Sequence, residues 1–290
     1  MNYTNCTLCP RQCGVDRTAG ELGFCGMTDE VRIAGAAPHY WEEPVICTER
    51  GAGAVFFSGC TLQCIYCQNE EISCKKQGKP VSSQELRQIF EDLAAQGCTT
   101  LDLVTPTHFL PTILPALQPK LPIPVVYNCG GYERVETLRQ LEGLVDVYLP
   151  DLKYSSASLA ASLSAATDYV ETAKAAILEM FRQTGPVRMQ DGVLQKGVII
   201  RHLVLPGQVD NSLGVLDWIA DTFRPGDVLV SLMSQYVPWG KAKTTPGLDR
   251  PITVEEYDGV LSYMELLGME DGFVQDFSSA TEAYIPQWDF

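Results

Sequence analysis

Short apolar runs alternate with helical patterns along most of this chain. Runs that suit buried strands occur at 54–58, 102–106, 123–128, 145–152, 197–205 and 227–233. Helical periodicity follows at 82–97, 134–144, 169–184, 210–223 and 253–267. Ser82 with Glu85, and Thr253 with Glu256, have the spacing of a capping box. We therefore expect helices to begin at these two positions.

This alternation predicts parallel strand pairing through right-handed crossovers. Six such units are fewer than the eight that close a barrel, so we expect an α/β fold with a curved, open sheet, a partial (βα)6 barrel. Residues 1–50 differ, because they are rich in Cys and Gly and only weakly periodic. We expect a Cys-rich N-terminal extension over 1–50 and a core domain with a C-terminal tail over 51–290.

Composition narrows the function classes. A hydrophobic content of 46% in 290 residues supports a full core, and a net charge of −15 argues against general binding to nucleic acid. No apolar run is long enough to predict a membrane span, and the N-terminus lacks the pattern of an export signal. The eleven cysteines therefore indicate ligands and thiols of a reducing compartment. We expect a cytoplasmic protein.

Cys60, Cys64 and Cys67 form a C-x3-C-x2-C motif directly after the first apolar run. Three thiolates on one short loop can hold a metal centre and leave one position open for a second molecule. Zinc ribbons and bacterial ferredoxins use other spacings. The motif therefore indicates an iron–sulfur cluster with one open iron.

Polar residues follow each of the predicted strands. In parallel sheets, ligands bind beyond the C-terminal ends of the strands, so these residues predict the rim of an active site. They are Gln68, Asn69 and Glu70 after the first strand, Thr105, Thr107 and His108 after the second, Asn128 after the third, Asp151 and Lys153 after the fourth, Arg201 and His202 on the fifth, and Gln235 after the sixth.

Several of these residues have a second interpretation. His108 could be a loop histidine with a structural partner, and His202 a neutral buried group. Asp151 and Lys153 face one side of a strand and could be a simple ion pair, although we favour a role in ligand binding. Arg201 suits a carboxylate or phosphate, because guanidinium offers two parallel donors.

Cys6, Cys9, Cys13 and Cys25 form a second cysteine motif near the N-terminus. Four thiolates suit either a structural zinc or a second iron–sulfur cluster. A metal would also organise a Gly-rich segment that has no core of its own. The alternative is a flexible cysteine-rich arm.

Together these motifs resemble the radical S-adenosylmethionine (radical SAM) proteins related to pyruvate formate-lyase activating enzyme, and above all its uncharacterised homologues. Tyr66, just before the last cysteine of the loop, belongs to this signature. The matching stretches are 6–10, 56–60, 67–69, 103–109, 126–128, 130–133, 146–154, 201–207 and 233–236.

The resemblance implies a partial (βα)6 barrel with a [4Fe–4S] cluster on Cys60, Cys64 and Cys67. It implies that SAM binds the fourth iron through its amino and carboxylate groups. Reductive cleavage of SAM would then yield a 5′-deoxyadenosyl radical that abstracts hydrogen from an unknown substrate. Tyr66 would lie against the adenine, and Asp151 and Lys153 match an Asp-Leu-Lys motif of the SAM site.

The chain departs from the activating enzymes in two loops. The activating enzymes carry Gly-Gly-Glu where this chain has Thr105-Pro-Thr-His108. They carry a histidine where this chain has Gln235-Tyr236. We take Thr105, Thr107, His108, Asn128, Arg201 and Gln235 as candidate cofactor-binding residues. Because the loops differ, activation of a glycyl radical enzyme is weakened as an interpretation.

The sequence thus predicts a radical SAM enzyme, an oxidoreductase or activase whose substrate it does not identify. The first alternative is an activating enzyme for a glycyl radical enzyme, or a modifier of another protein or peptide. The second is a non-catalytic iron–sulfur electron carrier, and the third a zinc-dependent binding module. We expect an external one-electron donor of the flavodoxin or ferredoxin type as a partner, and neither nucleic acid nor membrane.

Overall fold

A sheet with six parallel strands forms the centre of the molecule. The structure is a computed structural model that describes residues 1–277, so residues 278–290 of the expected C-terminal tail lie outside it. The six strands pair in chain order and overlap the six predicted apolar runs. They are β2 (Ala52–Phe57), β4 (Leu101–Val104), β5 (Val125–Cys129), β6 (Val147–Pro150), β8 (Val193–Leu203) and β9 (Leu229–Met233). The predicted α/β fold is confirmed.

Additional strands extend the sheet at both edges. β1 (Arg32–His39) runs antiparallel to β2, and β3 (Lys79–Pro80) pairs with the start of β1. β10 (Gly272–Val274) runs parallel to β9, and β7 (Arg188–Gln190) forms a hairpin with β8. The apolar pattern predicts none of these. The division at residue 50 stays a prediction, although β1 lies before it and pairs with β2 along its length.

The helices follow the strands as the pattern predicts. α3 (Ser83–Ala95), α7 (Tyr169–Thr184), α8 (Val209–Thr222) and α9 (Val254–Leu266) match four predicted helices, and both capping boxes form. The fifth is shorter than expected, because 134–144 holds only α5 (Val135–Leu138) and the 3-10 turn η3 (Arg139–Leu141). The sequence pattern does not predict α1 (Pro44–Cys47), α2 (Glu70–Ser73), α4 (Leu110–Ala116), α6 (Ala157–Ser164) or the turns η1 (Arg17–Ala19), η2 (Thr107–Phe109) and η4 (Gly240–Thr244).

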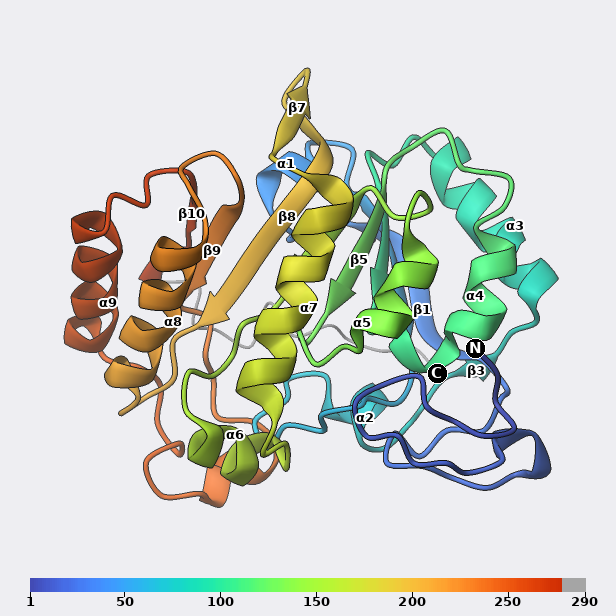
Figure 1. Cartoon of the computed structure of the whole chain (residues 1–290), viewed down its shortest axis with the longest axis horizontal. Coiled ribbons are helices and arrows are strands. Elements are labelled where there is room, and N and C mark those ends of the chain that lie inside the picture. The colour runs from blue at the N-terminus through green and yellow to red at the C-terminus, as the bar shows by residue number, and fades with distance from the viewer. Residues whose placement is uncertain (278–290) are drawn as a thin grey trace.

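The larger helices lie along one face of the sheet, and the strand arrows point toward the end where α2 and α6 lie (Figure 1). One large apolar cluster, which includes Phe90, Leu103, Tyr127 and Ile177, fills the space between sheet and helices. No helix within residues 1–277 is both long and apolar enough to cross a membrane.

The N-terminal segment, residues 1–31, contains no strand and only the short turn η1. It loops across the same end of the molecule as α2, below the C-terminal ends of the parallel strands (Figure 1). The Cys-rich segment therefore lies on the side of the barrel where ligands bind in parallel sheets.

Candidate functional site

A cavity of about 250 Å³ opens at the C-terminal ends of the parallel strands. Its wall comes from the cysteine loop after β2 and from the ends of β4, β5, β6, β8 and β9. Twelve of the predicted site residues line it: Cys60, Cys64, Tyr66, Cys67, Gln68, Asn69, Thr105, Asn128, Asp151, Lys153, Arg201 and Gln235. The strand ends thus bring together residues that are up to 175 positions apart.

Each sulfur of the cysteine loop accepts a hydrogen bond. The Leu62 N–H donates to Cys60 Sγ at 3.3 Å, within the loop itself. The Ser164 hydroxyl at the end of α6 donates to Cys64 Sγ at 2.9 Å, and Ser73 in α2 donates to Cys67 Sγ at 3.3 Å. Donors of this kind stabilise negative charge on sulfur, so the loop is built to carry thiolates.

Without a cation the thiols of Cys60 and Cys67 hold their protons. Burial, with the neighbouring Cys64, raises the pKa of Cys60 to about 11 and that of Cys67 to about 12. A bound metal centre reverses this, because its positive charge favours the deprotonated ligand. The donor set therefore suits a centre that brings several positive charges close to all three sulfurs.

Three cysteines on one short loop suit a [4Fe–4S] cluster that keeps one iron open. Within residues 1–277, no three His, Cys, Asp or Glu side chains converge as the ligands of one metal ion must. In a [4Fe–4S] cluster each thiolate binds a different iron, so the sulfurs stand further apart. Cys60, Cys64 and Cys67, on the wall of one cavity, fit the cluster and leave one side of it facing the cavity.

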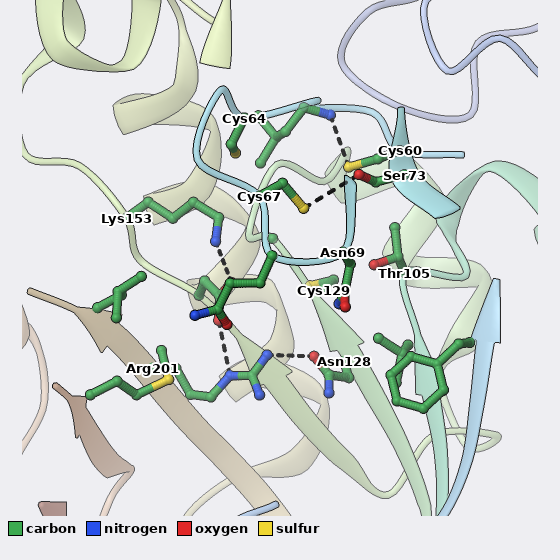
Figure 2. Close-up of a pocket in the computed structure, with 18 of the residues that line it drawn as sticks. Cys60, Cys64, Cys67, Asn69, Ser73, Thr105, Asn128, Cys129, Lys153 and Arg201 are labelled. Atoms are coloured by element: carbon green, nitrogen blue, oxygen red, sulfur yellow. Dashed lines mark hydrogen bonds and ion pairs between the residues drawn. The ribbon is translucent and has the colours of Figure 1, made fainter. Parts of the chain in front are cut away.

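An ion network crosses the cavity opposite the cysteines (Figure 2). Lys153 Nζ donates to Asp151 Oδ2, and Arg201 Nε donates to Asp151 Oδ1 at 2.9 Å. Arg201 also donates to Asn128 Oδ1 at 2.6 Å. Burial alone would raise the pKa of Asp151, but the charges of Lys153 and Arg201 hold it below its usual value. Asp151 is therefore ionised at neutral pH.

Acidic side chains form the deep end of this network. Glu42 accepts from Arg201 at 3.2 Å, and Asp102 accepts from Asn128 at 3.2 Å. Burial raises the pKa of Glu43 to about 7. The charge of Arg201 opposes this rise, and the charge of Glu42 adds to it. One oxygen each of Glu43 and Asp102 is buried with no hydrogen-bond partner.

Sequence reasoning does not identify these acidic residues. Asp102 carries a usable signal, since a charged residue inside the buried run Leu101–Val104 needs a polar partner. Glu42 and Glu43 precede α1 in the weakly periodic region, where no pattern assigns them to the site.

Three polar residues predicted near the rim have other partners. His108 Nε2 contacts the Ser58 carbonyl at 2.7 Å, and burial lowers the pKa of His108 to about 3. Thr107 donates to Glu133 at 2.7 Å. His202 lies between the Leu152 carbonyl and the Ser212 hydroxyl. None of the three lines the cavity.

The backbone is tightly shaped around the cavity. Gly131 has φ +77°, and a Cβ there would lie 2.1 Å from the Asp151 carbonyl oxygen, so both conformation and space require glycine. Thr105 also has a positive φ, +59°, which is uncommon for a β-branched residue. Tyr66 lines the wall with its ring and shares a 2.8 Å hydrogen bond with Tyr154. Its predicted contact with adenine stays a prediction.

Comparison with known proteins adds three findings. Residues 50–109, which include the cysteine loop, match the family model of a 4Fe-4S single cluster domain. The chain is 30% identical over 279 residues to the uncharacterized protein MJ0674 of Methanocaldococcus jannaschii, and the match covers 92% of this chain and 76% of that protein. Among solved structures, the fold is similar to that of SuiB from Streptococcus suis.

SuiB has been solved bound to its precursor peptide SuiA and bound to S-adenosylmethionine. The first structure gives a TM-score of 0.52 at 11% identity, with 76% of this chain covered. The second gives 0.50 at 13% identity, with 77% covered. The chain spans only 48% and 50% of these SuiB chains. At such identity the likeness shows the fold alone, which is an α/β fold.

Proposed function

The chain belongs to the family of the uncharacterized protein MJ0674, and from the geometry of its cavity we propose that it is a radical SAM enzyme. Cys60, Cys64 and Cys67 hold a [4Fe–4S] cluster, and SAM binds between that cluster and the ion network. When both are bound, they supply a 5′-deoxyadenosyl radical that abstracts hydrogen from a substrate.

The observation that carries this proposal is the cavity shared by the three cysteines and the ion network. A protein that only carries electrons needs no ligand cavity beside its cluster. Here the open side of the cysteine loop faces Lys153, whose ammonium group is held in place by Asp151. Burial alone would lower the pKa of Lys153, but the Asp151 charge raises it, so the group stays cationic.

Different residues of the cavity wall offer different groups to a ligand. Lys153 places a cation close to the cysteines, where it offsets the negative charge of thiolates and of a ligand carboxylate. Thr105 and Asn128 offer neutral polar groups at the ends of β4 and β5. Gln235 reaches the cavity from the loop after β9.

We extend the proposal to the partners. The cluster needs an external one-electron donor of the flavodoxin or ferredoxin class, and all eleven cysteines are free thiols, which suits the cytoplasm. Modification of another polypeptide, including activation of a glycyl radical enzyme, is the second candidate. It is favoured by the fold shared with SuiB, which was solved with a bound precursor peptide.

Anaerobic reconstitution with iron and sulfide, followed by reduction in the presence of SAM, tests the proposal. We expect wild type to form 5′-deoxyadenosine and methionine, and the triple variant Cys60→Ala, Cys64→Ala, Cys67→Ala to form neither. Cys98→Ala is the matched control, because this buried cysteine lies outside the cavity lining. Unchanged 5′-deoxyadenosine formation in the triple variant would refute the proposal.

A further inference from the structure

The four N-terminal cysteines are brought together by the backbone of the segment that carries them. Cys6 pairs with the chain eight and nine residues later, through Gly14 N–H to the Cys6 carbonyl and Cys6 N–H to the Val15 carbonyl, each 3.0 Å. This pairing holds Cys6 beside Cys13. The Phe24 N–H then donates to Cys13 Sγ at 3.3 Å, which places the next residue, Cys25, at the same point.

Hydrogen-bond donors surround these sulfurs, as they do in the cysteine loop. Burial raises the pKa of Cys9 to about 12 and also raises that of Cys25, and the backbone N–H groups of Arg11 and Met27, each two residues further along, oppose these rises. Leu62 does the same for Cys60. The repeated geometry indicates that both segments are shaped to stabilise thiolates.

A buried cation completes the surroundings. The side chain of Arg17 is fully buried, and its Nη1 lies 3.8 Å from Cys6 Sγ. It also donates to the carbonyls of Met27 and His108. A buried guanidinium beside four cysteines suits a site that carries net negative charge when its thiols are ionised.

We propose that Cys6, Cys9, Cys13 and Cys25 hold a second iron–sulfur cluster, separate from the one on the cysteine loop. Four thiolates complete the ligands of such a cluster, so it has no open iron and binds no substrate. Four thiolates can also bind a single zinc ion, which the content of acid-labile sulfide distinguishes from a cluster. The inference rests on the N-terminal segment alone and does not depend on the proposed function.

The second cluster lies against the cysteine loop. Arg11 Nε donates to the Thr61 carbonyl at 3.0 Å, and Gln63 Nε2 donates to the Phe24 carbonyl at 2.6 Å. A Cβ at Gly59, next to Cys60, would lie 3.1 Å from the Cys25 carbonyl oxygen and 2.4 Å from Met27 Cγ. The two ligand loops are therefore in direct contact.

This contact gives the second cluster a structural role. Metal binding to a segment without its own core is coupled to the ordering of that segment. Once ordered, residues 1–31 hold Thr61 and Gln63 of the cysteine loop from outside. Loss of the second cluster should therefore loosen both the N-terminal segment and the loop that it contacts.

The test uses the full chain with the cysteine loop disabled. The triple variant Cys60→Ala, Cys64→Ala, Cys67→Ala is reconstituted anaerobically, and iron, zinc and acid-labile sulfide are measured. We expect about four irons and four sulfides per chain to remain, about half the wild-type content. Adding Cys9→Ala and Cys25→Ala should remove them, whereas adding Cys47→Ala and Cys98→Ala should not.

Two results would overturn the proposal. One zinc without sulfide would show that the site binds a single ion, and absence of both metals would show that it binds none. In case the triple variant does not fold, the double variant Cys9→Ala, Cys13→Ala in the otherwise intact chain provides a second test, because two thiolates are too few to hold such a cluster. It should lose about half of the iron and be cleaved faster by protease within residues 1–31. Unchanged iron in this variant would also overturn the proposal, and neither test measures SAM cleavage.

Discussion

Arg201 and Asp151 face each other across the neighbouring strands β8 and β6, with Arg201 Nε 2.9 Å from Asp151 Oδ1. Both side chains are about 15% exposed. The same guanidinium also contacts Asn128 and Glu42, so it links four segments of the chain at the cavity. Burial would lower the pKa of Arg201, but its acidic neighbours, Asp151 first, raise it.

Replacing Arg201 should therefore destabilise the fold strongly. Arg201→Met leaves Glu42 without its ion-pair partner and leaves Asp151 with Lys153 alone, for which we expect a loss of about 3–5 kcal/mol in the free energy of unfolding. Anaerobic urea unfolding measures it. Arg32→Met is the matched control, because Arg32 pairs with Glu30 where both side chains are exposed, and its loss should cost far less. Equal losses in the two variants would contradict a special role for Arg201.

Lys153 should matter more for ligand binding than for folding. We expect Lys153→Ala to weaken SAM binding by at least tenfold, since a charge-assisted hydrogen bond contributes about 1.5–3 kcal/mol. The cluster should keep its iron. Lys120→Ala, which removes a lysine paired with Asp146 away from the cavity, should leave SAM binding unchanged. Calorimetric titration of SAM compares the two, and a drop in thermal midpoint with normal SAM affinity would assign Lys153 to structure.

The hydroxyl of Ser164 should set the reduction potential of the cluster on the cysteine loop. It donates to Cys64 Sγ at 2.9 Å, and such bonds stabilise the extra negative charge of the reduced state. Ser164→Ala should lower the potential by about 40 mV if the bond contributes about 1 kcal/mol. Ser162→Ala, which removes a hydroxyl bonded only to the Leu159 carbonyl, is the control. A redox titration followed by electron paramagnetic resonance would exclude this role if both variants matched wild type.

The buried carboxyl of Glu43 should make stability fall as pH rises. Its pKa is raised from 4.5 to about 7 in the fold, chiefly by burial. Below pH 4.5 the group is protonated in both states and its stabilising effect is complete; between 4.5 and 7 the unfolded state loses the proton first. We expect a loss of about 3 kcal/mol across this window.

Glu43→Gln should remove that part of the pH dependence and be more stable than wild type at pH 8. Glu49→Gln, an exposed neighbour in the chain, should keep the wild-type profile. Urea unfolding at several pH values provides the comparison. Parallel profiles for Glu43→Gln and wild type would mean that Glu43 does not titrate in this window.

The apolar pattern predicts the parallel strands and most helices because burial on both faces leaves a clear signal. The α7 helix begins and ends where predicted, at Tyr169 and Thr184. The pattern does not reveal β1, because Arg32–His39 is built from Gly, Ala and Pro rather than β-branched residues. The pattern also misses α4, because Pro111 and Pro115 are residues that usually interrupt a helix.

Site residues that directly follow a predicted strand can be identified from the sequence, and other site residues are harder to identify. Asp151, Lys153 and Arg201 come together because parallel strands place their C-terminal ends side by side. His108 has the same kind of position, yet its side chain turns toward Ser58 and away from the cavity. Rotamer choices of this kind depend on packing partners that are distant in sequence, such as Arg17, which donates to the His108 carbonyl.

The contacts of Arg11 impose an order on biogenesis. Arg11 Nη2 donates to the Ser164 carbonyl, 153 positions along the chain, so this contact cannot form until residue 164 has been synthesised. All four cysteines of the N-terminal segment, by contrast, are present once residue 25 has emerged. A nascent chain therefore carries these four thiols long before the surface that will cover them exists.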